Sequence, residues 1–290
     1  MVALNWLAFQ LACALVLGFA YARLFRGLSG PAERRLALAS ILAIMVSAWA
    51  AEDTSIRRYE MYAYPDSWWP ILDRVPLLVV LIWPLVVLTA RQVAGGLFPG
   101  GTPIRRALAV GAIVWIDASL IETVAVAAGL WRWAEGGYLG VPLIGLFGWA
   151  AYAFAAAWML ERFAGGMVGP RPWRARILVP VLAVGLTHLQ LVAAWWAFFR
   201  HALRSELPPG LAWVVLAALA ALTLGLRRRP TRIPAGAAIP RIAATSVFVV
   251  LLVLHVRRPE NVAHFAGVAI PYLGLLDWRG LGREFRRPKA

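Results

Sequence analysis

The amino-acid sequence predicts an all-α fold, a polytopic transmembrane helical bundle with about eight to nine spans. The first observation is composition: 61% of the 290 residues are apolar, 15% are charged, and the mean hydropathy is +0.71. A soluble domain of this length cannot bury so much apolar surface. The second observation is that the apolar residues form uninterrupted runs, whereas the strands of a transmembrane barrel alternate. The third is that arginines fall at the ends of these runs.

The apolar runs define the expected spans in chain order. They cover residues 4–24, 36–53, 74–92, 107–130, 141–163, 177–199, 210–226 and 241–256. A ninth run at 261–278 is weaker and is interrupted by a proline. No connection is long enough to fold alone, so we expect residues 1–290 to form a single integral membrane domain. Residues 233–240, rich in Pro, Gly and Ala, are expected to form a flexible connection.

The first span is expected to be a retained helix, because no basic segment and no small-residue cleavage pattern mark a signal peptide. It contains Cys13, the only cysteine, so the sequence has no disulfide framework and no thiolate metal site. The four histidines are scattered without ligand spacing. We therefore expect neither a metal nor a cofactor.

The second connection, residues 55–73, is rich in Tyr and Trp. Amphipathic rings of this kind settle at the membrane–water boundary, so this segment is expected to lie at the outer interface. Residues 279–290 form a basic C-terminal tail.

The basic residues also predict the orientation of the chain. Most of them lie in the first, third, fifth and seventh connections, as the pairs and clusters Arg23/Arg26/Arg34/Arg35, Arg91/Arg105/Arg106, Arg162/Arg171/Arg174/Arg176 and Arg227/Arg228/Arg229/Arg232/Arg241. The positive-inside rule places these connections in the cytoplasm and the N-terminus outside. The expected location of the protein is the cytoplasmic membrane of a bacterium or archaeon. A cytoplasmic basic tail requires an odd number of spans, which favours crossing by 261–278.

The net charge of +15 is explained by this topology and by anionic lipid head groups. No basic stripe is interleaved with aromatic residues on one element, so nucleic acid is not expected as a partner. The expected partners on these grounds are membrane lipids.

Two carboxyl groups, Asp117 and Glu122, interrupt the fourth span. With a rise of about 1.5 Å per residue, Asp117 lies about 16 Å from Arg105/Arg106, near the middle of a ~30 Å hydrocarbon layer. A carboxyl group at that depth costs at least a few kcal/mol. A helix that carries two is typical of a protein that handles protons, ions or a polar ligand.

With the predicted topology, other polar and aromatic residues gather around these two. Glu52 ends the second span at the outer face, and His188 lies near the middle of the sixth. Aromatic residues close the outer mouth: Trp131, Trp133 and Tyr138. A carboxylic acid in an apolar pocket can stay protonated near neutrality and protonate an alkene. Aromatic faces can then stabilise the resulting cation.

Structural roles compete with these assignments. Asp117 and Glu122 are about 140° apart around a regular helix, so one of them can be catalytic while the other pairs with an arginine or caps a neighbouring helix. His188 is more typical of a hydrogen-bonded bundle residue. Trp131 and Trp133 are also what an interfacial belt contains. Glu161, at a helix end, is expected to be solvated.

One stretch resembles a known family. It contains an acidic residue in a helix, then G-x-W-x-W over Gly129–Trp133, Y-x-G-x-P over Tyr138–Pro142, and Gly148-Trp149. This combination is similar to the carotenoid-biosynthesis membrane protein family that includes the γ-carotene and bisanhydrobacterioruberin hydratases. A second patch, Glu52 with Tyr62-x-Tyr64 and Val75-Pro76-Leu77, extends the resemblance to about 100 residues.

The resemblance implies a cofactor-independent hydratase, a lyase that adds water to a terminal C=C bond of an acyclic carotenoid end. The substrate would be a hydrophobic polyene or isoprenoid. Glu122 or Asp117 would be the general acid, with the other or Glu52 orienting water, and Trp131, Trp133 and Trp149 would line the cation site. The chain departs from the family where Thr123 replaces a Pro and Gly145 replaces an Asn, and these changes bear on the reaction more than on the fold.

Two other classes remain open on the sequence alone. A proton-coupled transporter or carrier of a hydrophobic molecule also uses buried carboxyl groups, although no matched halves are apparent. A non-catalytic membrane assembly partner would pair its carboxylates with arginines. An elongated apolar cavity ending at Glu122 would favour the enzyme.

Overall fold

The computed structural model describes residues 5–164, 173–200, 233, 235–256, 259–274, 276–280 and 282. The α-helices in this part are α1 (Trp6–Arg26), α2 (Pro31–Arg57), α3 (Leu77–Leu97), α4 (Pro103–Ala127), α5 (Leu143–Ala164), α6 (Leu178–Ala194), α9 (Ala235–Leu251) and α10 (Pro259–Leu273). A 3₁₀ turn, η1 (Trp173–Ile177), precedes α6, and the π-helical turns η2 (Trp195–Phe199) and η3 (Leu252–Val256) extend α6 and α9. The chain is therefore a helical protein, as expected.

Among the described residues, seven helices are long and apolar enough to cross a membrane. They correspond to the expected spans except 210–226, which lies outside the described residues, and 261–278. In the latter region α10 has 15 residues and is not one of the seven. At about 1.5 Å per residue it is shorter than a ~30 Å hydrocarbon layer. A total of eight or nine spans stays a prediction.

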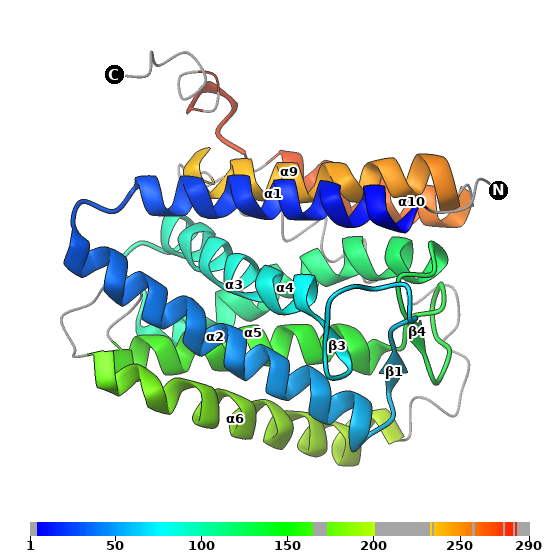
Figure 1. The fold of residues 1–290 in the computed structure, drawn as a ribbon, viewed down its shortest axis with the longest axis horizontal. Coiled ribbons are helices and arrows are strands. Elements are labelled where there is room, and N and C mark those ends of the chain that lie inside the picture. Colours follow the sequence, from blue (N-terminus) through cyan, green and yellow to red (C-terminus); the bar gives the residue numbers. More distant parts are fainter. Residues whose placement is uncertain are drawn as a thin grey trace.

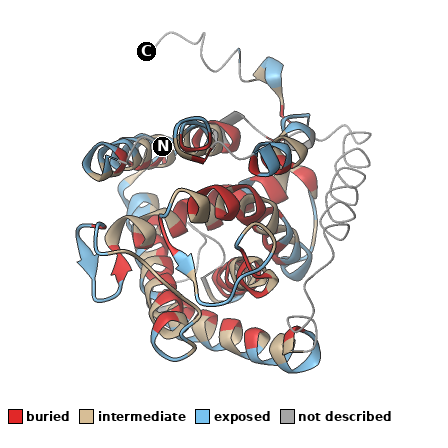
Figure 2. Cartoon of the chain, turned by 90° about the vertical axis from the view of Figure 1, so that its right-hand side faces the viewer, coloured by how far each residue is buried: buried red, intermediate tan, exposed pale blue. Residues whose placement is uncertain are grey.

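The long helices run side by side, with α3 and α4 between a layer of α1, α9 and α10 and a layer of α2, α5 and α6 (Figure 1). Buried residues concentrate on the inner helices (Figure 2). In the α4 and α5 spans 61% of residues are buried, against 17% in α1. Small residues allow this packing: a Cβ at Gly111 of α4 would lie 3.1 Å from the Ala150 carbonyl oxygen of α5.

α4 begins with two standard signals. The Thr102 side chain accepts the Arg105 N–H, and Pro103 occupies the first helical position. The helix ends before Gly129, whose φ of +78° suits glycine. The chain then turns back towards the helix axis, which brings the following tryptophans to the end of α4.

A short antiparallel ribbon joins two connections that are distant in sequence. β1 (Tyr62–Ala63) pairs with β4 (Arg132–Trp133), and Tyr62 lies opposite Trp133. A separate hairpin pairs β2 (Ile71–Leu72) with β3 (Val75–Pro76). Both lie beyond the C-terminal end of α2, and we call this end of the bundle the ribbon end (Figure 1).

Residues 55–73 pack against the protein more closely than a loop at the membrane interface needs to. Its first residues belong to α2, and Trp68 is buried, with its indole N–H donating to the Leu130 carbonyl oxygen at 2.8 Å. Its position at the outer interface stays a prediction.

Two expectations about the opposite end are wrong. Glu161 is not simply solvated, because it forms ion pairs with Arg91 and Arg106 and so ties α5 to α3 and α4. The expected flexible connection 233–240 is largely helical, since α9 begins at Ala235 and contains Pro240.

Candidate active site

Glu122, near the C-terminal end of α4, accepts hydrogen bonds from three indoles. Trp131 and Trp133 donate to Oε2 at 2.9 and 3.0 Å, and Trp149 donates to Oε1 at 2.7 Å. The side chain is only 1% exposed. All three donors are neutral, so they satisfy the carboxyl group without compensating its charge.

The local backbone explains how the three indoles converge. Trp131 and Trp133 follow the turn at Gly129, and β4 holds Trp133 against β1. Trp149 comes from the second turn of α5. Gly145, one turn earlier on α5, makes room for the ring of Trp133: a Cβ there would lie 2.6 Å from that ring. The glycine that departs from the family pattern is therefore a steric requirement of this arrangement.

Glu52, near the C-terminal end of α2, has a different set of donors. The hydroxyls of Tyr62 and Tyr64 both donate to Oε2, the latter at 3.0 Å, and Trp83 of α3 donates its indole N–H to Oε1 at 2.9 Å. Burial, followed by the negative charge of Glu52, holds the pKa of both tyrosines well above the usual value. Both phenols therefore remain protonated donors.

A cavity of about 60 Å³ lies between these two groups, and both carboxyl side chains line it. Its other polar or aromatic lining residues are Ser55, Tyr62, Tyr64, Trp83, Trp131, Trp133, Trp149, Tyr152 and Thr187. Its lining, within the described part of the chain, contains no lysine or arginine. We call it the carboxylate cavity.

The two donor sets pack against each other around this cavity. The ring centroids of Tyr62 and Trp133 are 4.8 Å apart, and those of Trp83 and Trp149 are 4.7 Å apart. Each contact joins one donor of Glu52 to one donor of Glu122. The two carboxyl groups thus share one aromatic enclosure assembled from four helices and two connections.

Asp117 points to a different part of the protein. Its carboxylate forms an ion pair with Arg241 of α9, and Arg241 also donates to the Thr89 hydroxyl of α3 at 2.9 Å. Asp117 and Glu122 therefore face different sides of α4, as their angular separation predicts. Arg241 was expected in a cytoplasmic connection, but it lies inside α9 and pairs at the depth of Asp117.

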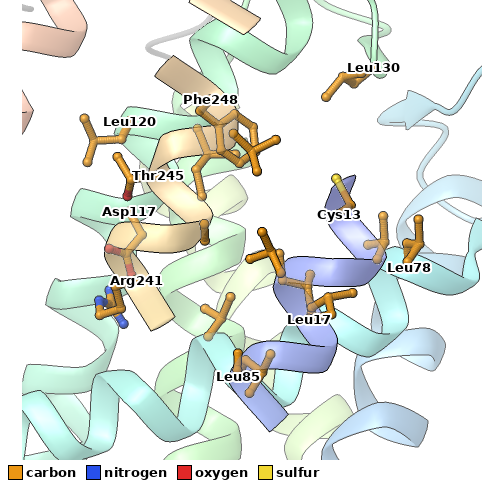
Figure 3. A pocket seen from close by; sticks show the side chains of 18 of the residues that line it. Cys13, Leu17, Leu78, Leu85, Asp117, Leu120, Leu130, Arg241, Thr245 and Phe248 are labelled. Carbon is orange, nitrogen blue, oxygen red and sulfur yellow. Dashed lines mark hydrogen bonds and ion pairs between the residues drawn. The ribbon is translucent and has the colours of Figure 1, made fainter. Parts of the chain in front are cut away.

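A second cavity of about 140 Å³, lined by α1, α3, α4 and α9, adjoins the carboxylate cavity. Most of its walls are aliphatic, and Figure 3 shows Leu17, Leu78 and Leu85 on one side and Phe248 on another. Tyr64, Trp131 and Trp149 line both cavities. We call it the apolar groove; Asp117 and Arg241 also line it.

Two expected substrate-binding residues do not line either cavity. Tyr138 packs against His264, with ring centroids 5.4 Å apart. His188 packs edge-on against Tyr59 at 5.5 Å, and neither of its ring nitrogens has a hydrogen-bond partner. A role of these two residues in substrate binding stays a prediction.

Sequence reasoning did not identify Trp83 or Arg241 as parts of these sites. Trp83 carried a signal, because an indole N–H inside an apolar span needs an acceptor. Arg241 was grouped with the other arginines of the seventh connection as a signal of membrane orientation. Nothing local in the sequence connects it with α4.

Among the described residues, no group of three His, Cys, Asp or Glu side chains is arranged to hold a metal ion. Comparisons of this chain with protein-family models, with curated proteins and with solved structures find no match.

Proposed function

We propose that this chain is an integral membrane enzyme of carotenoid or isoprenoid metabolism that adds water to a terminal C=C bond of an acyclic polyene. The observation that carries the proposal is the pair Glu52 and Glu122, which face one aromatic cavity that adjoins an apolar groove. A long apolar chain in the groove would present its end to both carboxyl groups. The family resemblance suggests the same reaction.

Glu122 is assigned as the general acid. Two carboxyl groups that face one cavity without a neighbouring cation repel each other when both are charged, which favours one proton on the pair. As Glu122 gives its proton to the less substituted alkene carbon, negative charge develops on its oxygens. The three indole N–H groups are already directed at those oxygens and stabilise that charge without reorganising.

The other product of this step is a tertiary carbocation. The indole and phenol rings that line the cavity supply the electron-rich surfaces that stabilise a cation. The charge is also attracted by the carboxylates on either side. The cavity therefore suits an intermediate with positive charge and no hydrogen-bonding group of its own.

Glu52 is assigned as the general base. A water molecule attacks the tertiary carbon, its O–H bond breaks, and Glu52 takes the proton, so that alkene and water give a tertiary alcohol. Transfer of one proton from Glu52 to Glu122 restores the starting state. The tyrosine hydroxyls on Glu52 can both donate and accept, so they can pass this proton on, whereas indoles can only donate.

The test is expression of the chain in cells that make lycopene or γ-carotene, followed by mass analysis of the extracted pigments. The expected result is a product heavier by one water, which disappears when Glu122 is replaced by Gln. The proposal is wrong if no hydrated pigment forms from either substrate, or if Glu122→Gln gives as much product as the wild type.

A further inference from the structure

We infer that the two reactants reach the carboxylate cavity from different sides: the polyene through the apolar groove, and water through a third cavity at the ribbon end. This inference rests on the proposed hydration. It assigns an aqueous entrance to a surface cavity that is separate from the reacting groups.

The third cavity has a volume of about 410 Å³ and is formed by the connection after α2, the connection after β4 and the end of α6. Its lining includes Glu60 and Glu135, both exposed, beside Tyr59 and Trp195. Exposed carboxylates at its mouth keep it hydrated, in contrast to the aliphatic walls of the groove. We call it the vestibule.

Only one layer of side chains separates the vestibule from the carboxylate cavity. Met61, Trp133, Ile144 and Leu191 line both. Trp133 is part of this layer and also donates its indole N–H to Glu122, so the layer is in direct contact with the proposed general acid. The ribbon supports it, because the Ala134 N–H donates to the Met61 carbonyl oxygen at 2.8 Å.

The groove meets the carboxylate cavity through a different wall, made by Tyr64, Trp131 and Trp149. No described residue lines both the groove and the vestibule. The helix α1, which forms one wall of the groove, exposes Leu7, Leu11 and Leu15 on its outer face, as a lipid-facing helix does.

Separate entrances have a chemical purpose. A tertiary carbocation reacts with whatever nucleophile is nearest, so water must arrive only at the carbon to be hydroxylated. An apolar groove keeps the rest of the polyene dry, while water enters through a different wall, past Met61, Trp133, Ile144 and Leu191. The single layer of side chains between the vestibule and the carboxylate cavity then limits how many water molecules reach the cation.

The first test measures access with thiol reagents and does not depend on catalysis. In a Cys13→Ser background, Met61→Cys and Ile144→Cys report on the vestibule wall, while the native Cys13 of the otherwise unchanged chain reports on the groove. A charged, membrane-impermeant methanethiosulfonate is applied to membranes containing each protein. We expect it to label the two vestibule cysteines at least about tenfold faster than Cys13, because a charged group in an apolar environment costs a few kcal/mol. A lipophilic maleimide should label Cys13 readily.

The inference would be overturned if the charged reagent labelled Cys13 as fast as the vestibule cysteines. It would also be overturned if the reagent labelled neither vestibule cysteine. If labelling follows the expected pattern but the wild type yields no hydrated product, the access routes stand and the proposed reaction is wrong. The two failures are therefore distinguishable.

The second test narrows each entrance. Leu191→Phe adds bulk at the vestibule wall, and Leu17→Phe adds bulk in the groove. Because water is present at constant concentration, Leu191→Phe should lower kcat with little change in KM for the polyene. Leu17→Phe should raise KM instead. The reverse pattern would contradict the assignment of the two entrances.

Discussion

α4 carries two buried carboxyl groups whose surroundings differ in kind. Asp117 faces Arg241, a cation that compensates its charge and fixes its position. Glu122 faces three indole N–H groups, which satisfy its oxygens but bring no charge. A carboxylate that forms an ion pair with arginine cannot be protonated without breaking that pair. One held by neutral donors can gain and lose a proton without breaking a salt bridge, which is what acid catalysis requires.

The comparison also shows why depth in the membrane does not identify a catalytic residue. Asp117 is nearer the middle of the fourth apolar run, where a charge is most costly, yet its partner makes it a structural contact between α4 and α9. Glu122 lies closer to the ribbon end, where the connection after α4 and the helix α5 supply its donors. The group that each carboxyl side chain contacts, and not its depth in the membrane, separates the structural role of Asp117 from the catalytic role proposed for Glu122.

The largest effect is expected from Glu122→Gln. The amide keeps the shape of the side chain but cannot transfer the proton, so hydration should fall by about 10²–10⁴-fold. Product per milligram of folded protein, measured by pigment extraction, checks this, and an unchanged melting temperature in detergent shows that the fold is retained.

Asp117→Asn should act on stability instead. It removes the carboxylate that compensates Arg241 and should lower the free energy of unfolding by about 3 kcal/mol. Denaturant titration in detergent measures the loss, and the double variant Asp117→Asn/Arg241→Gln should recover much of it. If Asp117→Asn instead abolished turnover in fully folded protein, the division of roles between the two carboxyl groups would be wrong.

Gly145→Ala tests whether the indole cage needs its exact placement. The new Cβ would lie 2.6 Å from the Trp133 ring, so the ring must move away from Glu122. Loss of that donor should cost about 1–3 kcal/mol of transition-state stabilisation, roughly a 5–150-fold decrease in kcat. Gly185→Ala on α6, where a Cβ meets nothing within 4 Å, is the matched control and should retain activity.

Tyr64→Phe is expected to have the smallest effect. It removes one of three donors to Glu52, worth about 1–2 kcal/mol, and leaves the Tyr62 hydroxyl in place. Because the pKa of Tyr64 lies well above its usual value, ionisation of this phenol should not appear in the pH profile at neutral or mildly alkaline pH. If the wild-type profile contained an ionisation near neutrality that was missing, rather than displaced, in Tyr64→Phe, this hydroxyl would titrate in the reaction.

The sequence predicts the helical class well, because long apolar runs have few alternatives in a chain of this composition. It also marks Glu122 and its tryptophans, since an acidic residue in an apolar run needs partners and the nearest indoles follow within one turn of the helix end. The pairing of Arg241 with Asp117 could not be predicted, because it depends on how α9 packs against α4. The same holds for Trp83, which reaches Glu52 only once α3 lies beside α2.

The β1–β4 ribbon has a consequence for biogenesis. Membrane helices are inserted as the chain is synthesised, so Glu52 enters the bilayer with Tyr62 and Tyr64 close behind it, and Glu122 follows later with Trp131 and Trp133. The three donors of Glu52 are all present once α3 has been made, but the shared enclosure is not closed until the connection after α4 docks on the one after α2, and Trp149 arrives only with α5. Completion of the carboxylate cavity is therefore a late event in assembly, and a chain interrupted before α5 would contain both acids without a finished site.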